Sequence, residues 1–468
     1  MIAFGPFELD PERKKLRRDG EPVPLNGRLA DVLCALVARP GQILTKDQLI
    51  QAAWRDVAVT DNSLEQAISA LRRLLGSGPS HQYIETEPRR GYRFVAPVTR
   101  VERRASDAAL EALLAPHRAW LEGRAALESL ERSEIARARG VFAGVVEAAP
   151  TQAPAHVGLA NACVMQFEMT RAEPSPDLAA LAVAAEHARE ACRLDAEYGE
   201  AWATLGFVLE RTGERPNALA ALRRAVSLEP DNWRHHVRLS YGSWGDERLR
   251  AARRALALLP GLAMAHWLAA TVHVAREAFA DAERELRAGL EAQQAAGPFS
   301  TVAVHWLTGL LLLRKGEHEQ ALEHFDRELA AESSGHLYAR ECCANTSYAI
   351  GALHLRCGRT TDAAAAFRLA IARLPFHPGA HVGLAFSEAT RPRRRQSAPA
   401  SIEQVFAEAA ALLLHGDGDQ AAARLERALE QAPPGNAGWL LPVEPLLNVA
   451  ANPVCWSRAL ARLRIRSV

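Results

Sequence analysis

The stretch AWATLGFVLERTGERPNALAALRRAVSLEP, residues 201–230, decides the fold of most of this chain. Counted from Gly199 as position 1, large apolar residues fall at positions 4, 7, 11 and 24, and small residues at positions 8, 20 and 27. The spacing on either side of Gly213 predicts two amphipathic helices joined by a short turn, and Pro230 ends the second helix. The small residues lie where the two helices would approach closely.

The same pattern recurs downstream in the same phase. Clear copies supply Gly309, Gly316, Ala321 and Phe325, then Gly351, Gly358, Ala363, Phe367 and Pro375, and finally Gly416, Ala421, Leu425 and Pro433. Weaker copies lie at about 119–150, 152–197, 233–260 and 263–296. The pattern resembles the 34-residue tetratricopeptide repeat. We therefore expect residues 108–468 to form an all-α superhelix of about eight repeats, several of them degenerate.

Residues 1–98 have a different pattern, in which short β-type runs alternate with helices. FGPFELD and KKLRRDG predict strands, with Asp19-Gly20 as a turn pair. Three helices follow, near residues 28–38, 46–54 and 60–76, with Asn26 and Thr45 as N-caps of the first two. YIETEPRRGYRFVA then predicts a hairpin. The charged segment 99–107 is interpreted as a linker.

The ordered set ILTKDQLIQAAW, VTDNSLEQAISALRRLLG and YIETEPRRGYRFVAPV resembles the winged-helix domain of the OmpR/PhoB type. It is most similar to the branch of CadC-, ToxR- and HilA-like transcriptional regulators. The predicted fold is therefore mainly α, with an N-terminal α+β winged helix-turn-helix domain followed by the tetratricopeptide-repeat superhelix.

The resemblance implies that the third helix enters the major groove of promoter DNA and that the hairpin tip touches the minor groove. Short polar side chains on that helix suit base edges, and arginines suit phosphates or a narrow groove. The alternative is an ordinary solvated flank. The residues expected to contact DNA are Asn62, Ser63, Gln66, Ser69, Arg72, Arg73, Arg89 and Arg90.

The loop between the second and third helices corresponds to a segment that can contact RNA polymerase in this family. It contains Arg55, Asp56 and Val57, and a plain connector is an equally good interpretation.

Residues 1–98 hold 14 basic and 12 acidic residues, a net charge of about +2. Such a weak field predicts salt-dependent binding strengthened by dimerisation or tandem sites.

The composition is typical of a soluble protein whose cysteines are reduced. The chain of 468 residues has a net charge of +1, 49% hydrophobic residues and seven cysteines without a CxxC pair. No signal peptide, transmembrane run or receiver domain is visible, so we expect a cytoplasmic one-component regulator. No GxxxxGK[ST], GxSxG, HExxH or spaced Cys/His set is present, so we expect no enzymatic activity, cofactor or metal.

The inner groove of the repeats carries a run of aromatic residues at position 5. With arginines at position 13, such a groove suits an apolar peptide or a flat small molecule. The alternative is that the rings pack on a neighbouring repeat or on the segment WLLPVEPLLNVAANPVCW near the C-terminus. The groove residues are Trp267, Trp306, Tyr348, Phe406, Arg314 and Arg356.

These observations favour a sequence-specific DNA-binding transcriptional regulator whose repeats sense an effector, bind a protein or peptide, or self-associate. One rival hypothesis is a protein-interaction scaffold in which the winged helix does not bind DNA. A second is an enzyme or signalling partner that uses the repeats.

Overall fold

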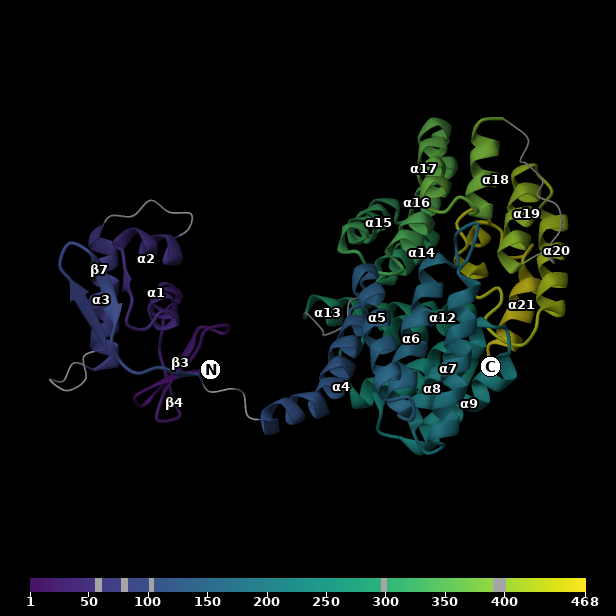
Figure 1. Cartoon of the computed structure of the whole chain (residues 1–468). Helices are drawn as coiled ribbons and strands as arrows, with labels where there is room; N and C mark the ends of the chain where they lie inside the picture. Colours follow the sequence, from purple (N-terminus) through teal and green to yellow (C-terminus); the bar gives the residue numbers. More distant parts are fainter. Residues whose placement is uncertain (55–60, 77–82, 101–104, 296–300, 390–400) are drawn as a thin grey trace. The chain divides into compact units, whose positions relative to one another are not determined.

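The computed structural model describes residues 1–54, 61–76, 83–100, 105–295, 301–389 and 401–468 (Figure 1). The chain divides into two compact units, residues 1–115 and 116–468, and each is described by itself. The expected fold class is confirmed, because a small α+β unit precedes a long array of helices. Within the segment predicted as linker, 99–100 form a strand and a helix begins at Ala105, while 101–104 lie outside the described residues.

The N-terminal unit contains two antiparallel sheets and three helices. The first sheet has the strand order β4-β3-β2-β1-β8 and the second has the order β5-β7-β6. The strands are β1 Ile2–Phe4, β2 Phe7–Asp10, β3 Lys15–Arg18, β4 Glu21–Val23, β5 Ile43–Leu44, β6 Ile84–Glu87, β7 Gly91–Phe94 and β8 Thr99–Arg100. The helices are α1 Gly27–Ala38, α2 Lys46–Ala53 and α3 Asp61–Leu75.

The caps predicted from sequence begin α1 and α2. The Asn26 side chain accepts a hydrogen bond from Leu29 N at 2.9 Å. Thr45 and Gln48 form a reciprocal capping box at the start of α2. These bonds satisfy amide groups that the helices themselves leave without partners.

The apolar stripe of α3 is buried, as its spacing predicts. Leu64, Ile68, Leu71 and Leu75 are at most 3% exposed. They join an aromatic core in which the Phe4 and Phe94 ring centroids lie 5.1 Å apart, edge to face. Because this stripe faces the core, the opposite side of α3 is left for solvent or a ligand.

The second unit begins with the C-terminal part of α4 and with α5, and continues as an array of helix pairs, α6/α7 to α16/α17 and α19/α20, with α18 between the last two pairs (Figure 1). Helix α21 and a strap of irregular chain, residues 436–447, complete it. The helices of the first half are α4 Ala105–Glu128, α5 Arg132–Ala148, α6 Ala153–Thr170, α7 Leu178–Leu194, α8 Gly199–Arg211, α9 Arg215–Leu228, α10 Trp233–Gly242 and α11 Gly245–Leu258. The later helices are α12 Ala263–Ala275, α13 Phe279–Gln294, α14 Val304–Lys315, α15 His318–Ala330, α16 Ala339–Arg356, α17 Thr360–Arg373, α18 Pro378–Ser387, α19 Ile402–Leu414, α20 Gly418–Gln431 and α21 Ser457–Arg466. The 3-10 helices are Ala331–Ser334, Leu441–Val443 and Val449–Ala451.

The glycine at position 8 of a repeat faces the large side chain at position 24. A Cβ on Gly206 would lie 2.6 Å from Leu222, one on Gly309 would lie 2.4 Å from Phe325, and one on Gly351 would lie 2.6 Å from Phe367. Real Cβ atoms do not approach other atoms so closely, so any larger residue would push the two helices apart. The small residues at position 8 therefore lie where the two helices of a repeat are in contact, as the sequence predicts.

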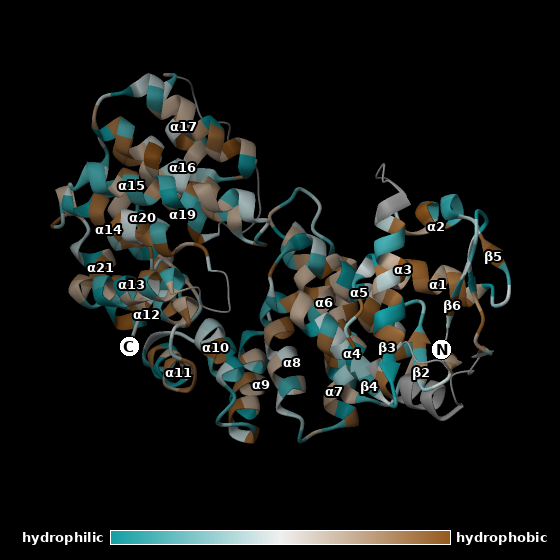
Figure 2. Ribbon diagram, turned by 90° about the vertical axis from the view of Figure 1, so that its left-hand side faces the viewer, coloured by the Kyte–Doolittle hydropathy of each residue, from teal (hydrophilic) through white to brown (hydrophobic). Residues whose placement is uncertain are grey.

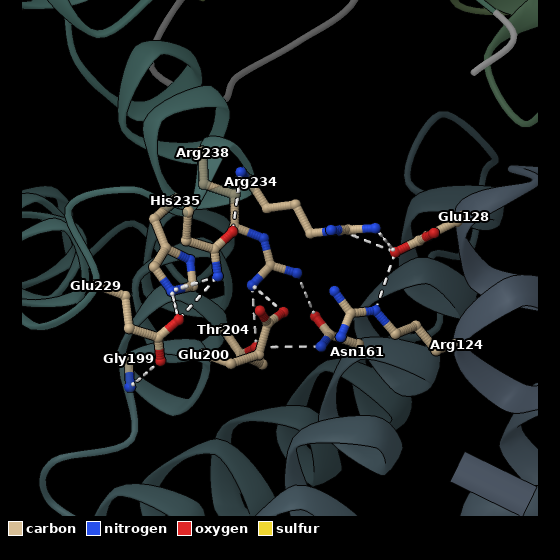
Figure 3. A network of polar contacts seen from close by, with 11 residues as sticks. Arg124, Glu128, Asn161, Gly199, Glu200, Thr204, Glu229, Arg234, His235 and Arg238 are labelled. Carbon is tan, nitrogen blue, oxygen red and sulfur yellow. Dashed lines mark hydrogen bonds and ion pairs between the residues drawn. The ribbon is translucent and has the colours of Figure 1, made fainter. Parts of the chain in front are cut away.

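Polar contacts connect the first helices of successive repeats (Figure 3). Arg238 of α10 donates to Asn161 Oδ1 of α6 at 2.9 Å and to Thr204 Oγ1 of α8 at 3.0 Å. Arg234, one turn earlier on α10, lies 2.6 Å from Glu128 of α4. A single helix thus contacts the three first helices that precede it, which fixes the curvature of the array.

Later repeats also contact early ones. Leu337 N donates to Leu130 O at 2.7 Å, and Tyr338 OH donates to Glu168 Oε2 at 3.0 Å. At the C-terminus, Arg276 Nε donates to Ser467 O at 2.9 Å. The repeats therefore form one closed body rather than an open solenoid.

Individual helices of this unit carry both brown and teal residues in Figure 2, which is typical of helices with one buried and one exposed side. Within the described ranges, we find no helix that combines the length and the apolar character needed to cross a membrane.

Candidate nucleic-acid interface and inner cavity of the repeats

The exposed side of α3 is polar and accessible. Gln66, Ser69 and Arg73 are exposed, and Ser63 is half-buried. Among the described residues, no hydrogen bond or ion pair involves the side chains of Gln66, Ser69 or Arg73. The face therefore presents free donors and acceptors of the kind that meet base edges and phosphates.

Glu65, a carboxylate on this face, has a partner that the sequence did not suggest. Lys46 Nζ, from the first turn of α2, lies 2.9 Å from Glu65 Oε1. Both side chains are well exposed, so this ion pair adds little stability. It does offset a negative charge that would otherwise repel DNA phosphates.

The sequence predicts that Arg72 contacts DNA, but in the structure its guanidinium group is hydrogen-bonded within the domain. Its Nε and Nη2 donate to Ile84 O at 3.0 and 2.9 Å, and Nη2 also donates to Thr86 Oγ1 at 2.8 Å. The guanidinium thus connects α3 to β6 and positions the hairpin beside the helix. Sequence spacing could not separate Arg72 from Arg73, because the strand that Arg72 contacts is distant in the chain.

The tip of the β6–β7 hairpin carries two exposed arginines, Arg89 and Arg90. Arg89 has a positive φ of 63°, and Gly91 has a φ of 136°. A Cβ on Gly91 would lie 1.9 Å from Leu44 O. Only glycine therefore fits where the start of β7 lies against β5, next to the two exposed arginines.

Replacing Gly91 by alanine is expected to destabilise the hairpin by more than about 2 kcal/mol, because backbone strain and a backbone clash coincide there. Hydrogen–deuterium exchange in residues 84–94 should rise, and exchange in the repeats should not change. Gly20→Ala is the matched control, because Gly20 has a φ of 87° and open space around it. Equal effects of the two substitutions would contradict the close approach to Leu44.

Some of the predicted interface cannot be placed. Arg55, Asp56 and Val57, the predicted polymerase-contact segment, lie outside the described residues. Asn62 belongs to α3, but its side chain is not among those described.

In the second unit, the four predicted groove aromatics line one cavity. Trp267, Trp306, Tyr348 and Phe406 all contribute to it, and the cavity volume is about 410 Å³. Trp439 of the strap packs edge to face on Trp267 and Trp306, with ring centroids 6.2 and 6.3 Å apart. The strap therefore fills part of the groove, which is the packing on the chain's own C-terminal segment that the sequence left open.

The two groove arginines do not line this cavity. Arg314 lies over the Phe279 ring, 3.6 Å from its centroid. Arg356 donates to Pro445 O of the strap, and Tyr348 OH donates to Glu444 of the same segment. Arg356 thus holds the strap in place instead of forming a basic edge to the groove.

His377 lies in the cavity wall and caps α18. Its Nδ1 accepts a hydrogen bond from Ala380 N at 3.2 Å, and its ring lies 4.7 Å from that of Tyr348. Burial lowers the pKa of His377 to about 4. Burial, with His324 nearby, also lowers the pKa of His305 to about 4.

From the lowered pKa values of these two histidines, we expect the folded protein to lose stability in acid. Each has a pKa in the folded state that lies below its value of 6.5 in the unfolded chain. The contribution of a neutral histidine to the free energy of unfolding is therefore fully present above pH 6.5 and is lost as the pH drops towards 4. Thermal unfolding of wild type should show this fall between pH 7 and pH 4.5. His377→Asn, which can still cap the helix, should reduce the fall; an unchanged pH dependence would contradict a neutral buried His377.

Comparisons with known proteins match these two units separately. Residues 20–94 match the family "Transcriptional regulatory protein, C terminal", and residues 199–232 match "Tetratricopeptide repeat". The N-terminal unit is an OmpR/PhoB-type winged-helix domain. It is followed by tetratricopeptide repeats, so the predicted fusion is confirmed.

Two curated relatives that the chain matches are transcriptional activators. The chain is 33% identical over 100 residues to the transcriptional activator CadC of Escherichia coli (strain K12), which covers 21% of this chain and 20% of CadC. It is 38% identical over 118 residues to the cholera toxin transcriptional activator of Vibrio cholerae, which covers 23% of this chain and 40% of that protein. The chain thus matches between a fifth and two fifths of the length of these relatives.

Among solved structures, the DNA-binding domain of E. coli CadC is 32% identical, with 21% of this chain and 95% of that chain covered and a TM-score of 0.20.

Proposed function

We propose that this protein is a sequence-specific DNA-binding transcriptional regulator, and that its repeats sense an effector or assemble with a protein partner. The observation that carries the proposal is the exposed polar face of α3 beside an arginine-tipped hairpin. Gln66 and Ser69 would meet base edges in the major groove, and Arg73 a phosphate. Arg89 and Arg90 would enter the adjacent minor groove.

The contacts around α3 support this assignment. Arg72 ties the helix to β6, so the face of α3 and the hairpin are held as one surface. The Glu65 carboxylate is paired with Lys46. Of the α3 side chains that the structure describes, those that remain free are uncharged or basic, which suits a polyanion.

The small net charge of the domain points to more than one bound copy. With a charge of about +2 in residues 1–98, one domain would bind weakly at physiological salt. Two domains on half-sites about one helical turn apart would reach useful affinity. Contact between residues 55–57 and RNA polymerase, and a cytoplasmic location, remain predictions.

The test is a gel shift of the intact protein on promoter fragments recovered by genomic footprinting, repeated over a salt series. The logarithm of affinity should fall linearly with the logarithm of salt concentration, and footprints should recur at spaced half-sites. Absence of any recovered promoter, or affinity that is insensitive to salt, would favour the scaffold hypothesis.

A further inference from the structure

The cavity inside the repeats is lined in a regular way. Four helices along the array, α12, α14, α16 and α19, each supply one aromatic residue of the lining, and the residue three positions before each of these also lines the cavity. These pairs are Met264 and Trp267, Ala303 (the N-cap of α14) and Trp306, Asn345 and Tyr348, and Glu403 and Phe406. The residue that precedes the aromatic ring is therefore apolar at α12 and α14 and polar at α16 and α19.

The strap limits what this cavity can hold. Residues 441–447 are buried, and Trp439 of the strap packs against the two tryptophans of α12 and α14. An extended peptide would need the volume that the strap already fills. The remaining 410 Å³ falls within the range of roughly 300–1,000 Å³ that is typical of small-molecule sites.

Most charged groups of the lining already have partners. Arg171 pairs with Glu168 and Glu341, and Glu444 accepts from Tyr348 OH and from Leu447 N. Among the described residues, by contrast, the exposed Glu403 carboxylate has no ion pair, and the Asn345 amide has no hydrogen bond. The polar end of the cavity therefore presents one free carboxylate and one free amide beside aromatic rings.

The aromatic rings and the free carboxylate together indicate the shape and the charge of a ligand that would bind. Indole and phenyl faces attract cations and stack on flat rings. A carboxylate without a partner at the edge of an aromatic cavity favours an ammonium group over an anion. We propose that the cavity binds a small aromatic amine, with its ring against Trp267 and Trp306 and its ammonium group at Glu403 and Asn345.

This proposal rests on the proposed function, because it supplies the chemical class of the effector. Binding itself is measured without DNA. A failed gel shift with intact amine binding would overturn only the regulator assignment, whereas a normal gel shift without amine binding would overturn only the ligand assignment.

The experiment is a calorimetric titration of the intact protein with tryptamine and with indole-3-propionate, which has the same ring and chain but the opposite charge. Tryptamine should bind saturably at one site, at least about tenfold more tightly than the acid. Glu403→Gln should weaken tryptamine binding at least about tenfold and leave the circular-dichroism spectrum unchanged.

Glu319→Gln is the matched control. Glu319 is also an exposed glutamate in the first turn of its helix, α15, and it does not line the cavity. Its replacement should not alter binding. Tryptamine binding that is absent, that is unaffected by Glu403→Gln, or that is weaker than binding of the acid would overturn the proposal.

Discussion

Replacing Gln66 and Arg73 together by alanine is expected to lower the affinity for promoter DNA roughly 30- to 1,000-fold, or about 2 to 4 kcal/mol. Gln66 would lose a paired hydrogen bond to a base edge, which sets sequence preference. Arg73 would lose a phosphate contact, which sets salt dependence. A gel shift over a salt series separates the two losses, because removing Arg73 should reduce the salt slope by about 1 per bound domain.

The repeats offer a matched control for this variant. Gln320 and Arg327 on α15 are the same two residue types, with the same spacing of seven residues on an exposed helix face. Replacing them by alanine changes charge and helix content equally, so promoter affinity should stay at the wild-type value. If both double variants bind like wild type, α3 does not contact DNA.

The second large effect is expected from Glu168→Gln, inside the repeats. The Glu168 side chain is fully buried; its Oε1 lies 2.6 Å from Arg211 Nε, although without hydrogen-bond alignment, and its Oε2 lies 3.2 Å from Arg171 Nε. Burial opposes the charge on Arg211, but Tyr241 and Glu168 outweigh it and raise the pKa of that guanidinium. The substitution removes the fully buried carboxylate that both arginines share and leaves Arg211 with Glu210 at 3.9 Å and Arg171 with Glu341, so the free energy of unfolding should fall by about 3 to 5 kcal/mol.

Urea unfolding followed by circular dichroism measures this loss. Glu173→Gln is its control, because Glu173 lies just beyond the same helix and pairs with Arg340 of α16 at 3.8 Å. Both of these side chains are well exposed, so this substitution should cost less than about 1 kcal/mol. A similar small cost for Glu168→Gln would mean that the early and late repeats are not joined through that carboxylate.

The sequence predicts most of the local structure of this protein. The N-caps at Asn26 and Thr45, the buried stripe of α3 and the glycines at position 8 all follow from patterns spanning fewer than 35 residues. Such patterns are informative because helix caps and helix-pair contacts join residues that are close in the chain. For the same reason, the aromatic residues that line the cavity could be chosen from the repeat phase alone.

The sequence does not predict which polar side chains are free. Arg72 and Arg73 are adjacent, and nothing in the chain distinguishes them until β6 accepts the hydrogen bonds of Arg72. Glu65 likewise has no evident partner until α2 brings Lys46 within 2.9 Å. These pairings depend on how α2, α3 and the hairpin pack, which a helical period does not specify.

The same division holds for the repeats. Sequence alone determined that helix pairs would stack and that their inner face would be aromatic, because both properties recur at the same positions of successive repeats. Only the tertiary structure decided that the strap closes this face, with Trp439 against two repeats and Arg356 holding Pro445. The physical reason is that the strap contacts residues roughly 90 to 170 positions earlier, and contacts at such separation leave no periodic mark in a sequence.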